Sequence, residues 1–163
     1  MGGMSVIIRP SRLEDLPQIC GFWRQHWGDD FMVAHGVIYR PETLSGFIAL
    51  DDDLWVGLIT YLFVGSDCEI VSLDSLREGQ GIGSRLIQSV IAEANRAGSR
   101  RLSLITTNDN LEALGFYQKR GFELVRVNRG AIQESRRIKP GIPLIGEHGI
   151  PLRDEIEMEM ALR

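Results

Sequence analysis

Short apolar runs divided by polar turn residues dominate the first half of the chain and predict β-strands. Four such runs occur, at residues 6–8, 47–50, 54–64 and 68–73. The run 54–64 is apolar at consecutive positions, which is typical of a central strand buried on both faces. Turn residues at 51–53 and 65–67 separate it from its neighbours, so residues 47–73 are predicted to form an antiparallel meander. Gly57 inside the long run predicts a bulge or a close backbone contact.

Apolar residues spaced three and four apart predict three helices. The first begins near Ser11, where Glu14 three residues later completes a capping box. Its apolar face comprises Leu13, Leu16, Cys20, Trp23 and Trp27. On this face Cys20 is expected to be a core residue rather than a nucleophile. The other two helices span 82–97 and 110–120, and a glycine follows each of them directly.

The second half of the chain alternates helices with strands. Strands are predicted at 101–106 and 122–127, on either side of the third helix. This order predicts right-handed crossovers and parallel pairing of consecutive strands. A final strand is indicated where glutamates alternate with Ile156, Met158 and Met160. The predicted fold class is therefore α/β, with a mixed, mostly antiparallel sheet and helices on both faces.

Composition narrows the class of protein. The chain has 163 residues, 44% apolar and 25% charged, which fits one globular domain over residues 1–163. A net charge of −4 argues against a nucleic-acid binder with a basic surface. No apolar stretch reaches the ~20 residues that a membrane helix needs, so we expect no membrane partner. The two cysteines form no CxxC pair, so we expect a cytoplasmic protein. His26, His35 and His148 have no metal-site spacing, and we expect no metal.

A glycine-rich segment, LDSLREGQGIGSRL at residues 73–86, joins a predicted strand to a predicted helix. Its glycines stand at alternate positions, Gly79, Gly81 and Gly83. Glycine lets the backbone approach an anion closely, and a helix N-terminus offers unpaired N–H groups, so the segment predicts a phosphate cradle. The alternative is a glycine-rich turn that caps an ordinary helix. The spacing fits neither the dinucleotide-binding fingerprint nor the P-loop.

Two motifs in this order resemble the signatures of the GNAT acetyltransferase family. The acyl-CoA signature Q/R-x-x-G-x-G/A corresponds to residues 78–83, with Glu78 in place of Gln or Arg. The second signature, N-x-x-A-x-x-F/L-Y-x-x-x-G-F, matches at Asn110, Ala113, Phe116, Tyr117, Gly121 and Phe122. The resemblance implies an N-acetyltransferase in which an amine attacks acetyl-CoA directly within a ternary complex. It also implies splayed central strands that form the cofactor cleft.

The resemblance carries over to particular residues. It implies cofactor-binding roles for Leu73, Gln80, Gly81, Ile82, Gly83, Ser84, Arg85 and Asn110. The backbone N–H of Leu73 would polarise the thioester carbonyl. Asn110 would contact the pantetheine arm, and its alternative is plain helix N-capping. Tyr117 corresponds to the general acid, and its alternative is one more core aromatic residue.

Glu69 is the candidate general base, since its strand resembles one that carries a catalytic glutamate in some family members. A partly desolvated carboxylate there would have a raised pKa. The alternative is a solvent-facing glutamate on an amphipathic strand.

The acceptor is expected to be a small-molecule or peptide amine. Residues 28–46, which include His35, and residues 128–153, a long proline-containing loop, are the candidate walls of its site. Two other functions stay open, a non-catalytic acyl-CoA-binding sensor and an enzyme for a longer acyl-CoA. A homodimer is compatible with the family resemblance.

Overall fold

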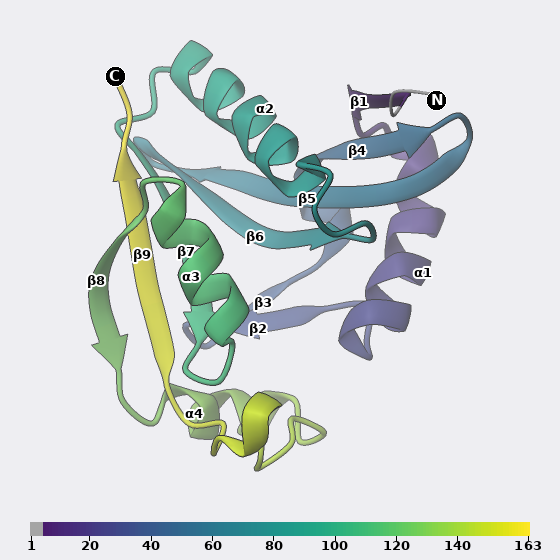
Figure 1. Ribbon diagram of the computed structural model, residues 1–163. Helices are drawn as coiled ribbons and strands as arrows, with labels where there is room; N and C mark the ends of the chain where they lie inside the picture. Colours follow the sequence, from purple (N-terminus) through teal and green to yellow (C-terminus); the bar gives the residue numbers. More distant parts are fainter. Residues whose placement is uncertain (1–4) are drawn as a thin grey trace.

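One seven-stranded sheet forms the centre of the computed structural model, which describes residues 5–163 (Figure 1). Its strand order is β1-β4-β5-β6-β7-β9-β8. The strands are β1 Val6–Pro10, β4 Ser45–Asp51, β5 Leu54–Val64, β6 Asp67–Ser75, β7 Arg101–Thr107, β8 Glu123–Asn128 and β9 Glu155–Ala161. Of the neighbouring strands in this sheet, β6 and β7 pair in parallel and the others are antiparallel. The predicted α/β class with a mostly antiparallel sheet is confirmed.

Helices cover both faces of the sheet, as predicted. They are α1 Leu16–Trp27, α2 Ile82–Arg96, α3 Leu111–Lys119 and α4 Ala131–Ile138. Residues of α2 and α3 share one core cluster with the sheet, whereas Ile19, Phe22 and Trp23 of α1 belong to a second cluster. A separate hairpin, β2 Met32–Ala34 and β3 Val37–Tyr39, lies near α1 (Figure 1). Within residues 5–163, no helix is long and apolar enough to span a membrane.

The parallel pairing between the central strands β6 and β7 ends about halfway along their length. Their pairing runs from Asp67 opposite Arg101 to Ile70 opposite Leu104 and goes no further. On the other side of β6, Thr60 pairs with Ser72 and Tyr61 with Ile70, so Val71 is the extra residue of a bulge. A bulge bends its strand locally. The predicted splay of the central strands is therefore present, and it begins at this bulge.

The predicted parallel pairing of consecutive strands is correct for β6 and β7 but wrong for the next pair. The last strand, β9, lies between β7 and β8 and is antiparallel to both. Met158 of β9 is fully buried, whereas Leu124 and Val127 of β8 are more than half exposed. The strand with the buried apolar face takes the inner position, and β8 becomes the sheet edge.

The capping box predicted at Ser11 and Glu14 is wrong. The N–H of Ser11 donates to the carbonyl of Gly46, 2.9 Å away, so Ser11 continues the sheet rather than capping a helix. Asp15 takes over the capping role, because its carboxylate accepts the N–H of Arg12 at 2.7 Å. The same carboxylate is held by the guanidinium of Arg9 at 2.8 Å, and this bond is the main reason that the pKa of Asp15 is lowered.

The apolar face predicted for the first helix is rotated relative to the one observed. Leu13 precedes α1 in a short 3-10 turn, Leu13–Asp15, and is 86% exposed. The side chains that α1 buries are Ile19, Phe22 and Trp23. Cys20 is consequently half-buried rather than a core residue.

Gly57 makes the close contact that its position in a long apolar strand predicts. A Cβ atom there would lie 2.9 Å from Cγ2 of Ile82, 3.0 Å from Cδ1 of Leu86 and 3.1 Å from the carbonyl oxygen of Asp74. The missing side chain therefore lets α2 pack directly on β5, which fixes where the helix begins relative to the sheet.

We expect Gly57→Ala to destabilise the fold by roughly 1–3 kcal/mol, because α2 would have to move away from the sheet. Gly21→Ala is the matched control, since a Cβ there meets nothing within 4 Å. It should stabilise α1 by about 0.5–1 kcal/mol. Urea denaturation measures both free energies of unfolding, and an unchanged value for Gly57→Ala would contradict the close packing.

Candidate active site

The segment 76–82 forms an open loop that ends at the N-terminus of α2. Gly79 and Gly81 have positive φ angles of 71° and 73°, a conformation that favours glycine. Gly81 is the N-cap of α2 and brings no side-chain cap. The first backbone N–H groups of the helix therefore have no intrahelical partner and can donate to an anion.

The third glycine, Gly83, serves helix packing. A Cβ there would lie 3.0 Å from Cζ of Phe116 in α3. Arg120 lies over the same ring, 3.5 Å from its centroid, and donates to Oγ of Ser84 at 2.8 Å. The sequence analysis missed Arg120, although it stands directly before Gly121 of the second motif.

These elements enclose a first cavity of about 440 Å³. Its lining includes seven of the predicted site residues, Leu73, Gly81, Ile82, Gly83, Ser84, Asn110 and Tyr117. Gln80 and Arg85 are exposed and do not line it, so their cofactor-binding roles stay predictions.

Tyr117 packs among aromatic rings at the wall of the first cavity. Its ring lies edge-on to Phe116 and Phe122, with centroids 5.3 and 5.4 Å away. Burial, and then the charge of Asp74, raise the pKa of the Tyr117 phenol well above its usual range. The hydroxyl is therefore protonated at ordinary pH, as a general acid must be before it donates.

A second cavity of about 300 Å³ lies between the middle of β6, the end of β7, the end of α1, the β2–β3 hairpin and α4. Asn110 lines both cavities. Its side chain accepts the N–H of Ala113 at 3.2 Å, so it is the N-cap of α3. The capping alternative is thus present, and it uses the side-chain oxygen of Asn110 rather than the amide nitrogen.

Glu69 stands in the second cavity within a cluster of titratable side chains. The hydroxyl of Tyr39 donates to its carboxylate at 3.0 Å, and Nε2 of His35 lies 3.6 Å from the same oxygen. Nδ1 of His35 lies 3.6 Å from Glu157. His35 has a positive φ of 52°, and its N–H donates to Glu155 at 3.3 Å. Glu69 is only 17% exposed, so it is not a freely solvated residue.

The pKa values of three residues in this cluster are raised. The hydrogen bond with Glu69 raises the pKa of His35. Burial is the main reason that the pKa of Tyr39 and that of Glu155 are raised. His35 belongs to the segment 28–46, which the sequence predicts as a wall of the acceptor site, and its contacts place it at the centre of this charged group.

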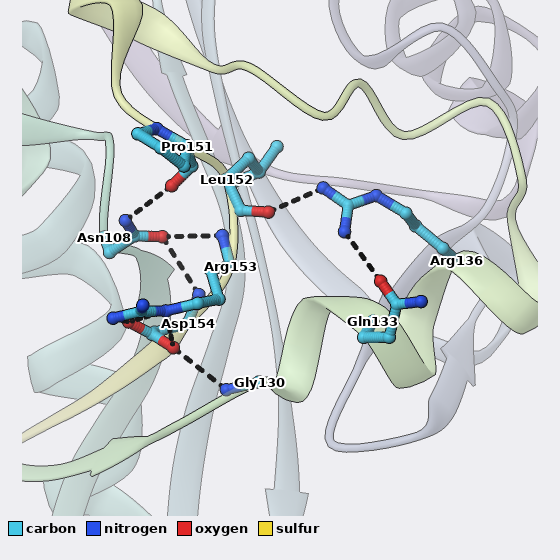
Figure 2. A network of polar contacts seen from close by, with 8 residues as sticks. All are labelled: Asn108, Gly130, Gln133, Arg136, Pro151, Leu152, Arg153 and Asp154. Atoms are coloured by element: carbon cyan, nitrogen blue, oxygen red, sulfur yellow. Dashed lines mark hydrogen bonds and ion pairs between the residues drawn. The ribbon is translucent and has the colours of Figure 1, made fainter.

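Residues 128–153 were predicted to be a long loop, but they contain α4 and a 3-10 turn, Glu147–Gly149. Asn108 holds the end of this segment, as Figure 2 shows. Its Nδ2 donates to the carbonyl of Pro151 at 2.9 Å, and its Oδ1 accepts the N–H groups of Arg153 and Asp154 at 3.0 Å. Asp154 accepts the N–H of Gly130, directly before α4.

Arg136 of α4 holds the segment from within. Its guanidinium donates to the carbonyls of Ile142, Pro143 and Leu152 (Figure 2 shows the last of these). The segment is therefore fixed against the strand ends. Five of its residues line the second cavity, Ile132, Ser135, Lys139, Ile142 and Leu152.

The glycine loop before α2 and two cavities that share Asn110 form a site with room for two substrates, and comparison with known proteins gives its family. The chain matches the model of the acetyltransferase (GNAT) family over residues 10–122. It therefore belongs to this family, and it is an acyltransferase with acetyl-CoA as its cosubstrate.

The relatives agree with this assignment. The chain is 43% identical over 152 residues to the uncharacterized protein YdhI of Bacillus subtilis, covering 93% of this chain and 95% of that protein. An IAA acetyltransferase from Bacillus cereus has a TM-score of 0.73 at 23% identity, covering 97% of this chain and 100% of that one. A GNAT family acetyltransferase from Elizabethkingia anophelis, solved with acetyl-CoA bound, has a TM-score of 0.70 at 20% identity, covering 96% and 98%.

The raised pKa of His35 predicts a pH-dependent contribution to stability. It is present in full below the unfolded-state pKa of about 6.5, and it is lost as the pH rises through the higher folded-state pKa. The loss of free energy of unfolding caused by His35→Asn, a residue that tolerates positive φ, should therefore shrink between pH 5.5 and 8.5. In a Glu69→Gln background most of this pH dependence should vanish. A pH-independent loss would contradict the contact.

Proposed function

We propose that this enzyme transfers an acetyl group from acetyl-CoA directly to an amine held in the second cavity. The observation that carries the proposal is that Asn110 lines both cavities and that the two cavities take in successive parts of β6, Glu69 to Val71 in the second and Leu73 in the first, around the point where its pairing with β7 ends. Two reactants on opposite sides of one gap can react without a covalent enzyme intermediate.

The residues present fit the cosubstrate. The uncapped N-terminus of α2 and the guanidinium of Arg120 are donors for its phosphates. Beyond Ile70, β6 has no partner strand on its β7 side, and Leu73 lines the first cavity in this stretch. Acetyl-CoA supplies a thioester carbonyl, and the N–H of Leu73 is our candidate donor to its oxygen, an interaction worth about 3 kcal/mol.

Glu69 and Tyr117 divide the proton transfers. Glu69 lines the acceptor cavity and takes a proton from the amine, directly or through a water molecule. Tyr117 lines the cofactor cavity and donates a proton to the sulfur of the leaving thiolate. The base and the acid thus stand on the two sides of the gap that the reaction requires.

Three broader inferences accompany this function. Residues 1–163 act as one domain, since β1 and β9 belong to the same sheet. The enzyme works in the cytoplasm, an inference supported by its free cysteines, Cys20 and Cys68. It associates as a homodimer through a sheet edge, for which the exposed apolar residues of β8 are the candidate surface.

Tyr117→Phe should lower kcat by about 100-fold or more, because a general acid contributes at least that factor. Its affinity for acetyl-CoA, measured by calorimetry, should change little, since phenylalanine keeps the packing on Phe116 and Phe122. Tyr61→Phe is the matched control, because Tyr61 is a buried tyrosine outside both cavities.

Unchanged turnover in Tyr117→Phe would remove Tyr117 from the mechanism. Tight acetyl-CoA binding with no release of CoA to any amine would instead favour the non-catalytic sensor.

Glu69→Gln should lower kcat and abolish the loss of activity at acid pH, since glutamine cannot take up the proton. Glu159→Gln is the control, because Glu159 pairs with Arg101 on the surface and does not line the acceptor cavity. A pH–rate profile that keeps its acid limb in Glu69→Gln would assign the base to another group.

A further inference from the structure

Glu155 is a buried carboxylate in the acceptor cavity. It is 2% exposed and lines the cavity together with Glu69. It accepts the backbone N–H of His35, but within residues 5–163 no lysine or arginine forms an ion pair with it. The positive group of this cluster is His35, which also faces Glu69 and Glu157, so three carboxylates share one imidazole. An excess of buried carboxylates over counter-charges is unfavourable. A bound ammonium group would supply a second positive charge, and this is the form in which most amines exist at neutral pH.

The α4 side of the same cavity presents groups of the opposite kind. Ser135 is 1% exposed, and its hydroxyl has no hydrogen-bond partner in the described part of the chain. Lys139 is the residue that directly follows the end of α4. Both residues line the cavity.

The ammonium of Lys139 is incompletely satisfied. Its Nζ lies 3.3 Å from the carbonyl oxygen of Phe31 and 3.4 Å from that of Trp27, which are long distances for hydrogen bonds. It also lies 5.2 Å from the centroid of the Phe31 ring. In the described chain, no carboxylate pairs with it. The positive charge and the unpartnered hydroxyl of Ser135 together are suited to a carboxylate.

Apolar side chains complete the wall of the cavity. They come from the hairpin, from α4 and from the segment after it, namely Met32, Val33, Ile132, Ile142 and Leu152. A cavity of about 300 Å³ is at the small end of ligand sites. It suits a compact molecule with an apolar body better than a polyhydroxylated or polymeric one.

We propose that the acceptor is a small free amino acid with an apolar side chain. Its ammonium group binds at Glu69 and Glu155, and its carboxylate binds at Lys139 and Ser135. This inference rests on the proposed function. The bound ammonium group first gives one proton to Glu69, and the free amine then attacks the acetyl carbon. As the carbon–sulfur bond breaks, Tyr117 protonates the sulfur, and the second proton lost from the nitrogen restores the Tyr117 hydroxyl through water. The products are an N-acetylamino acid and CoA.

The test compares amino acids with the matched amines that lack only the carboxylate: leucine with 3-methylbutylamine, and phenylalanine with 2-phenylethylamine. CoA release should show a kcat/KM at least ten-fold higher for each amino acid than for its matched amine.

The variants test the residues. Lys139→Gln and Ser135→Ala should each reduce the ratio of kcat/KM between amino acid and amine, mainly through KM. Glu155→Gln should raise KM for both members of a pair. Lys119→Gln, on the exposed end of α3, should leave the ratio unchanged.

Equal or better use of the decarboxylated amines would overturn the inference and would make Lys139 a structural tie to Trp27 and Phe31. Preference for spermidine, an aminoglycoside or a peptide N-terminus would also overturn it, while the proposed function would stand.

If acetyl-CoA binds but no amine releases CoA, the proposed function fails separately. Calorimetry of leucine against the CoA complex then decides the inference, because binding supports it and no binding to wild type overturns it.

Discussion

The loss of pairing between β6 and β7 is the constraint on which the rest of this molecule depends. A sheet normally satisfies its backbone groups through neighbouring strands, but here the pairing ends at Ile70 and Leu104. The bulge at Val71 also shifts the alternation of side chains, so that Leu73 faces the α2–α3 side while Asp74 accepts a hydrogen bond from Trp27 of α1. One irregularity thus opens a gap and assigns side chains to both of its sides.

The two sides of the gap are shaped by different kinds of interaction. On the α2 side the loop relies on backbone geometry, because Gly79 and Gly81 are in the left-handed region and Gly83 admits Phe116. On the other side, charge dominates, with Glu69 and Glu155 brought together around His35. The first cavity is therefore shaped largely by the main chain of the glycine loop, whereas the second is shaped by charged side chains.

Features encoded by neighbouring residues were predictable from the sequence. The long apolar run gave the central position of β5, and the alternating glycines gave the loop before α2. Features that depend on distant residues were not predictable. The position of β9 between β7 and β8 follows from a pairing across the whole chain, and Asn108 meets Pro151 only after folding. Ser11 and Glu14 have the local sequence of a capping box, but the backbone of Ser11 bonds to Gly46 in the sheet instead.

The α4 segment is anchored almost entirely through main-chain atoms. Arg136 and Asn108 bond carbonyl and N–H groups that every amino acid possesses. Side chains such as Ile132 and Ile142, which face the acceptor cavity, take no part in these bonds. Exchange of such wall residues would therefore alter the shape and polarity of this cavity while leaving intact the bonds that hold its wall in place.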